Sequence, residues 1–119
     1  MEFEIEYYET LKGVHYARKF LDKLESKNKD LWTCTLGLIK NLKYKQYHTL
    51  PYSKVLGGGL FEIRPRVGKN TCRINYCFVG KQKIYLLNGF IKNDKKTQER
   101  EIKKAKKLMQ ECKEREKYA

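Results

Sequence analysis

Residues 57–90 constrain the fold of this chain most strongly, because two consecutive segments there alternate between apolar and polar side chains. Leu60–Arg66 and Cys72–Phe78 both follow the period of two residues that is typical of a β-strand with one buried face. Val67–Asn70 lies between them and contains the turn residues glycine and asparagine. The stretch therefore predicts an antiparallel hairpin. Ile84–Leu87 follows as an apolar strand that we expect in the centre of the sheet.

Both faces of this hairpin indicate the same register. With Val67–Asn70 as the loop, the opposed pairs are Arg66 with Thr71, Arg64 with Arg73, Glu62 with Asn75, Ile63 with Ile74, and Phe61 with Tyr76. Apolar residues then meet on one face and polar residues on the other, which is what specifies a register. Arg64 and Arg73 face each other, although like charges across a ladder are destabilising by about 0.2–1 kcal/mol. We interpret this opposition as a sign that the polar face holds an anion.

The segment before the hairpin predicts one strand and two helices. Met1–Tyr8 alternates between glutamates and apolar residues, which predicts a first strand. Apolar residues at helical spacing then predict a helix that is capped by Thr10 and ends near Ser26. A second apolar stripe begins at Leu31 and predicts a helix to about Lys43. Because the connection is short, the two helices are expected to be an antiparallel pair.

After the hairpin, the sequence predicts a last helix that is capped by Asp94 or Thr97 and runs nearly to Tyr118. The chain is expected to form a single domain over residues 1–119. Its predicted class is α+β, with an N-terminal strand, two antiparallel helices, a three-stranded antiparallel meander that completes one sheet, and a C-terminal helix. We expect the helices on one face of the sheet and the polar residues on the other.

The chain carries a large excess of positive charge, with 27 Lys and Arg against 14 Asp and Glu and a formal net charge of +13. Such an excess favours a polyanionic partner. One basic segment, Lys43–Lys54, interleaves lysines with tyrosines and is expected to be a loop broken at Pro51. Its tyrosines could stack on bases beside phosphate contacts, or they could pack the helices onto the sheet. The sequence leaves both interpretations open.

No apolar run approaches the length of a membrane span, and the acidic N-terminus has the character of neither a signal nor a transit peptide. We therefore expect a cytoplasmic protein with no membrane partner. The four cysteines lack CxxC spacing and clustered histidines, so neither a zinc site nor another cofactor is expected. All four are expected to be free thiols.

Arginines on a bare sheet face suit phosphate, because the guanidinium fork can bond two phosphate oxygens at once. Cleavage of RNA by its own 2′-hydroxyl would additionally require groups that accept and donate protons. The chain has only two histidines, His15 in the first predicted helix and His48 in the basic loop. Glu62 could also act, although a carboxylate beside arginines is more often their ion-pair partner. The sequence leaves the proton-transfer groups unassigned.

The segments LPYSKVLGGGLFEIRPR and CRINYCFVGKQKIYLLNGFIKNDKK, followed by a charged helix, resemble the HigB-type toxins of the RelE superfamily. The resemblance is to the phage-derived HigB-like branch. The matching positions are Lys54 and Leu56, Gly59–Arg64, Arg73–Tyr76, and Leu86–Lys92. The match covers about half of the chain, and the order of the elements agrees throughout.

The resemblance implies a toxin of a type II toxin–antitoxin pair, an endoribonuclease that cuts mRNA without a metal ion, mostly in the ribosomal A site. Arg64 and Arg73 would orient the scissile phosphate and stabilise the transition state, with Lys92 acting beside them. The residues implied to hold mRNA or ribosomal RNA are Lys54, Arg66, Lys95 and Lys96. The implied partners are mRNA, the ribosome and a helix-turn-helix antitoxin of the HigA type, which alone would contact operator DNA.

Two departures leave the detailed mechanism open. Several RelE-type toxins carry a tyrosine after the last strand, whereas the next tyrosine after Tyr85 in this chain is Tyr118. Asn93 also interrupts the paired lysines often found there. Two other functions remain possible: a non-catalytic RNA- or DNA-binding regulatory protein on the same scaffold, and a protein-binding domain with a basic surface.

Overall fold

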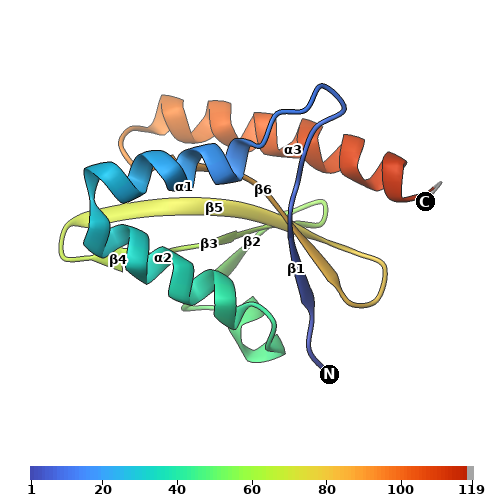
Figure 1. Cartoon of the computed structure of the whole chain (residues 1–119), viewed down its shortest axis with the longest axis horizontal. Coiled ribbons are helices and arrows are strands. Elements are labelled where there is room, and N and C mark those ends of the chain that lie inside the picture. The colour runs from blue at the N-terminus through green and yellow to red at the C-terminus, as the bar shows by residue number, and fades with distance from the viewer. Residues whose placement is uncertain (118–119) are drawn as a thin grey trace.

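The computed structural model describes residues 1–117 and organises them around one mixed sheet (Figure 1). In chain order the elements are β1 (Glu4–Tyr7), α1 (Tyr16–Lys27), α2 (Lys29–Asn41), the 3-10 helix η1 (Lys45–His48), β2 (Ser53–Gly57), β3 (Leu60–Ile63), β4 (Arg66–Val67), β5 (Asn70–Val79), β6 (Lys83–Ile91) and α3 (Lys95–Lys117). The strand order is β1-β6-β5-β3-β2, and the short β4 pairs with β5. Strand β1 is parallel to β6, and the other pairs are antiparallel. The predicted α+β class is confirmed.

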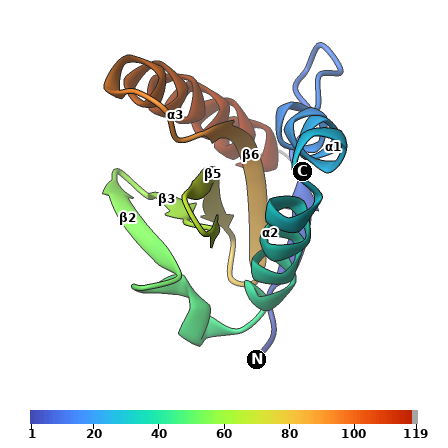
Figure 2. The ribbon, with the colours of Figure 1, turned by 90° about the vertical axis from the view of Figure 1, so that its left-hand side faces the viewer.

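Helices cover both faces of the sheet (Figure 2). Helices α1 and α2 pack on the face that contains Ile63, Ile74 and Tyr76. Helix α3 packs on the opposite face, where its buried residues Ala105, Leu108, Met109 and Cys112 contact a cluster that includes Leu60, Cys77 and Leu87. The prediction that all helices share one face is therefore wrong. The alternation in the strands assigns residues to faces but does not say which helix covers each face.

The boundaries of the helix pair depend on local hydrogen bonds. Helix α1 begins at Tyr16, later than predicted, because the hydroxyl of Thr10 accepts from the Val14 amide in a preceding turn and does not cap the helix. Asn28 does cap α2, since its side-chain oxygen accepts from the Leu31 amide at 3.1 Å. Capping oxygens of this kind satisfy amides that have no partner within the helix.

The sequence did not predict strand β2. It begins within the basic segment, and its residues Ser53–Val55 pair with Phe61–Ile63 of β3. The connection turns through Gly57, Gly58 and Gly59, which have φ values of 95°, 64° and 91°. Only glycine adopts such angles without strain, so the triple glycine allows the chain to turn sharply from β2 into β3.

No helix within residues 1–117 is long and apolar enough to cross a membrane. Tyr118, near which the last helix was predicted to end, lies outside the described residues.

Candidate functional site

The hairpin register places the polar residues as the sequence predicts. Strand β3 pairs Glu62 with Asn75 and Ile63 with Ile74, and β4 pairs Arg66 with Thr71. Val67 also pairs with Asn70, so the turn itself consists of the two residues between them. Arg64 follows the last residue of β3, and its amide donates to the carbonyl of Tyr52 at 3.2 Å. Glu62, Arg64 and Arg73 therefore meet on the face that α3 partly covers.

Glu62 is the centre of this group. Its carboxylate oxygen lies 3.6 Å from Nε of Arg73 and 4.0 Å from Nε of Arg64. The Glu62 and Arg73 side chains are only 8 % and 5 % exposed, whereas Arg64 is 33 % exposed. Arg73 also donates from Nη1 to the carbonyl of Cys72 at 3.0 Å. The predicted bare face is thus wrong for Glu62 and Arg73, and Arg64 is the arginine that reaches solvent.

Burial shifts the pKa values of both members of the buried pair. Burial raises the pKa of Glu62, and the positive charges of Arg73, Arg64, Lys54 and Lys92 oppose that rise. Burial also lowers the pKa of the Arg73 guanidinium, with Arg64 adding to the decrease and Glu62 opposing it. Both shifts have the same meaning: the cost of removing these charges from water exceeds their mutual attraction. A phosphate brought to this surface would meet a net positive charge, because one carboxylate faces two arginines and two lysines.

Two lysines complete the cluster from neighbouring elements. Lys54 of β2 is the cross-strand partner of Glu62. Lys92 follows β6, and its amide donates to the Thr71 carbonyl at 3.1 Å, which holds it beside the start of β5. Both act on the carboxylate of Glu62. We call Lys54, Glu62, Arg64, Arg73 and Lys92 the basic cluster.

The other three predicted RNA-binding residues lie outside the basic cluster. Arg66 is exposed, and its Nε donates to the carbonyl of Gly68 in the hairpin turn at 2.9 Å. Lys95 and Lys96 are exposed in the first turn of α3, a few residues beyond Lys92.

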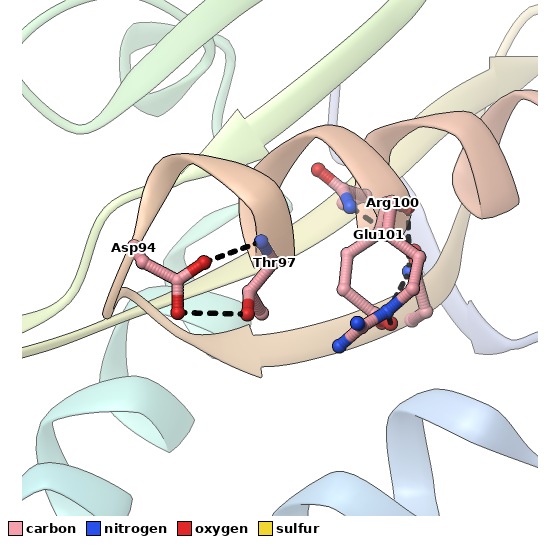
Figure 3. Close-up of polar contacts among 6 residues, drawn as sticks. Asp94, Thr97, Arg100 and Glu101 are labelled. Carbon is pink, nitrogen blue, oxygen red and sulfur yellow. Dashed lines mark hydrogen bonds and ion pairs between the residues drawn. The ribbon is translucent and has the colours of Figure 1, made fainter.

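Asp94 caps α3, because its two carboxylate oxygens accept from the amide and hydroxyl of Thr97 at 2.8 and 3.2 Å (Figure 3). These bonds, led by the one from the Thr97 amide, lower the pKa of Asp94. Lys95 and Lys96 lie just inside the cap, at the positive end of the helix dipole, where cations are unfavourable. Together with Lys92, they make this end of α3 an attractive site for an anion.

A row of buried amides, which sequence reasoning missed, connects the basic cluster to α3. Asn75, opposite Glu62, donates from Nδ2 to Asn88 at 3.1 Å, and Asn88 donates to the backbone and side chain of Glu101. Within residues 1–117, the side-chain oxygen of Asn75 is buried without a hydrogen-bond partner. Asparagine in the middle of strands was the available signal, because asparagine is depleted there.

The histidines lie away from the basic cluster. His48 is buried, its Nε2 lies 2.6 Å from the Leu42 carbonyl, and its ring packs against Phe3 and Phe78. His15 precedes α1, outside the helix in which it was predicted, and pairs with Glu9 at 2.9 Å. Among the described residues, no group of three acidic, histidine or cysteine side chains is arranged to hold a metal ion. The four cysteines are free thiols.

The fold defines the class of protein to which this chain can be compared. An N-terminal strand, two helices, a mixed sheet and a C-terminal helix are compatible with a RelE-like fold. The model of the family described as phage derived protein Gp49-like (DUF891) matches residues 19–110, more than half of the chain. The chain belongs to this family of type II toxin–antitoxin toxins in the RelE/ParE superfamily, and the family implies an antitoxin partner. No curated protein matches the chain significantly.

Proposed function

We propose that this protein is an mRNA interferase that cleaves messenger RNA at the basic cluster and thereby arrests translation. The observation that carries the proposal is the convergence of Arg64, Arg73, Lys54 and Lys92 around the carboxylate of Glu62. The cluster brings together four of the seven residues that the resemblance assigns to RNA. Membership of a family that suggests a toxin of the RelE type, a type whose members are generally endoribonucleases, supports the same conclusion.

The proposed reaction uses the nucleophile that RNA already carries. The 2′-oxygen loses its proton and bonds to phosphorus, the bond from phosphorus to the 5′-oxygen breaks, and the 5′-oxygen takes up a proton. The products are a 2′,3′-cyclic phosphate and a 5′-hydroxyl. Arg64 contacts the phosphate directly and stabilises the charge that develops on it, because a preorganised guanidinium needs little reorganisation. Lys92 supports the same charge from beside it.

Glu62 and Arg73 position the site in this proposal. The buried carboxylate draws both guanidinium groups toward one point, which fixes Arg64 at the surface and Arg73 below it. Lys54 holds the RNA backbone, with Arg66, Lys95 and Lys96 as more distant contacts. Since both histidines lie elsewhere, the titratable members of the basic cluster are the available proton carriers. Because the basic cluster has few groups that can transfer protons, its reaction gains most from a ribosome that aligns the message for cleavage.

The remaining parts of the proposal follow from this function. The antitoxin is of the helix-turn-helix HigA type, and operator DNA is contacted only through it. The toxin acts in the cytoplasm, on the ribosome, and needs no metal ion.

Expression in a bacterium tests the proposal. Wild type and Arg64→Ala are induced, growth is followed, and new 5′ ends are mapped on translated messages. Lys40→Ala is the matched control, because Lys40 is exposed on α2, on the opposite face of the sheet. We expect new ends within codons for wild type and Lys40→Ala. Arg64→Ala should yield about 100-fold fewer new 5′ ends, which is the typical effect of losing one hydrogen-bond donor that stabilises the transition state.

Two results would point elsewhere. Growth arrest without new 5′ ends would favour the non-catalytic RNA- or DNA-binding protein. Equal cleavage by Arg64→Ala and wild type would remove the basic cluster from the reaction.

A further inference from the structure

Two tyrosine rings from the segment that leads into β2 pack on each other. Tyr47 of η1 and Tyr52, the residue before β2, have ring centroids 4.5 Å apart and planes inclined by 47°. Tyr52 is 39 % exposed, and Tyr47 is half-buried. Among the described residues, the hydrophobic clusters under the helices include neither ring. The alternative in which these tyrosines pack the helices onto the sheet therefore does not hold for this pair.

The backbone that carries the two rings is held in place. The Ser53 hydroxyl donates to the carbonyl of Tyr47 at 2.8 Å and accepts from the hydroxyl of the buried Tyr76 at 2.7 Å. The amide of Tyr52 donates to the Thr49 carbonyl at 3.1 Å. The pair is thus tied to the core of the sheet, and little conformational entropy would be lost when a ligand contacts it.

The position of Tyr52 relates the pair to the phosphate site. Ser53 pairs with Ile63, and the next step of the ladder brings the Tyr52 carbonyl to the amide of Arg64 at 3.2 Å. Strand alternation puts Tyr52 on the same face as Lys54 and Arg64. Side chains directly opposite each other have Cβ atoms about 4.5–5.5 Å apart. The backbone of an exposed tyrosine is therefore paired with that of the one arginine of the basic cluster that reaches solvent.

We propose that Tyr52, supported from behind by Tyr47, stacks on the nucleobase next to the phosphate that Arg64 holds. This inference rests on the proposed function and adds the element that recognises the base. In single-stranded RNA, each phosphate of the backbone has an unstacked base beside it. Stacking is tolerant of sequence because every base has a π-face. The lysines that flank the rings, Lys45 and Lys54, suit RNA better than an apolar protein surface.

Fluorescence of a stacked base tests this proposal directly. The probe is a short single-stranded RNA with one 2-aminopurine, titrated with wild type, Tyr52→Ala and Tyr52→Phe. The control is Tyr44→Ala, because Tyr44 is equally exposed in the same segment but lies against Lys43. We expect quenching by wild type, Tyr52→Phe and Tyr44→Ala. For Tyr52→Ala the quenching should be lost and the affinity should fall about 5- to 100-fold.

The outcomes separate this proposal from the one on which it rests. Equal quenching and affinity for Tyr52→Ala and wild type would overturn it, as would a folded wild type that leaves the fluorescence unchanged. If Tyr52→Ala loses quenching but the wild type cuts no ribosome-bound message, stacking stands and the proposed nuclease fails. Thermal unfolding of each variant shows that the comparison is made between folded proteins.

Discussion

At the scale of single residues, the unusual feature is a carboxylate and a guanidinium buried together in a strongly basic protein. A buried ion pair between Glu62 and Arg73 does not stabilise the fold by itself, because both charges leave water. The proposed role of this ion pair is to fix the position of the Arg64 side chain. The burial of this pair could not be predicted from the sequence, since alternation assigns a face to a residue but not the helix that covers it.

Glu62→Gln tests the burial of this charge through the pH dependence of stability. Because burial raises the pKa of Glu62 in the folded state, the folded protein binds this proton more tightly than the unfolded chain does. The stability that this proton contributes is fully present below the ordinary glutamate pKa of 4.5 and is lost as pH rises through the raised pKa. The unfolding free energy of wild type, relative to Glu62→Gln, should therefore fall with pH in that window. Each pKa unit corresponds to about 1.4 kcal/mol.

Urea unfolding at a series of pH values measures this difference. Glu25→Gln is the matched control, because Glu25 is exposed on α1 and its variant should follow the wild-type pH dependence. A difference between wild type and Glu62→Gln that does not change with pH would show that Glu62 is not desolvated as described.

At the scale of elements, the sheet depends on a close approach between α1 and β6. A Cβ built on Gly89 would lie 2.5 Å from a ring carbon of Phe20 and 2.6 Å from Cδ1 of Ile74. Both contacts are shorter than van der Waals distances. Glycine at this position therefore lets the helix seat its aromatic ring on the strand.

Gly89→Ala should be destabilising for this reason, by about 1–3 kcal/mol, as is typical when atoms are added to a packed core. Gly37→Ala is its control, because Gly37 lies in α2 and a Cβ added there would meet no atom within 4 Å. Alanine at position 37 should raise the unfolding free energy by about 0.5–1 kcal/mol, because alanine has a higher helix propensity than glycine. Urea unfolding of both variants measures the effects. A Gly89→Ala protein as stable as wild type would contradict the packing of α1 on β6.

The elements also show what the sequence could and could not predict. The β3–β5 register was predictable because two faces of different polarity agree on one pairing, as Ile63 with Ile74 and Glu62 with Asn75 show. Strand β2 was not, because its sequence SKVLG does not alternate between polar and apolar residues, and it follows a proline and ends in the first of three glycines. The placement of Tyr52 opposite Arg64 depends on β2, so it could not be predicted from the sequence either.

At the scale of the whole molecule, the net charge of +13 indicated a polyanionic partner but not where that partner binds. We propose that this partner binds where the fold brings lysines and arginines from β2, the end of β3, β5 and the end of β6 around one carboxylate. The resemblance implies all four of these lysines and arginines. It could not distinguish them from Arg66, Lys95 and Lys96, which lie outside the basic cluster, because matching a motif does not measure proximity.

The proposed cleavage of mRNA by the basic cluster on the ribosome can be measured as a rate. The measurement uses end-labelled mRNA in purified ribosomes with an empty A site, with wild type and Arg64→Lys. Lysine keeps the positive charge but loses the guanidinium fork that grips phosphate. We predict cleavage within the A-site codon by wild type and a rate about 100-fold lower for Arg64→Lys. No cleavage by folded wild type, or an unchanged rate for Arg64→Lys, would contradict the account.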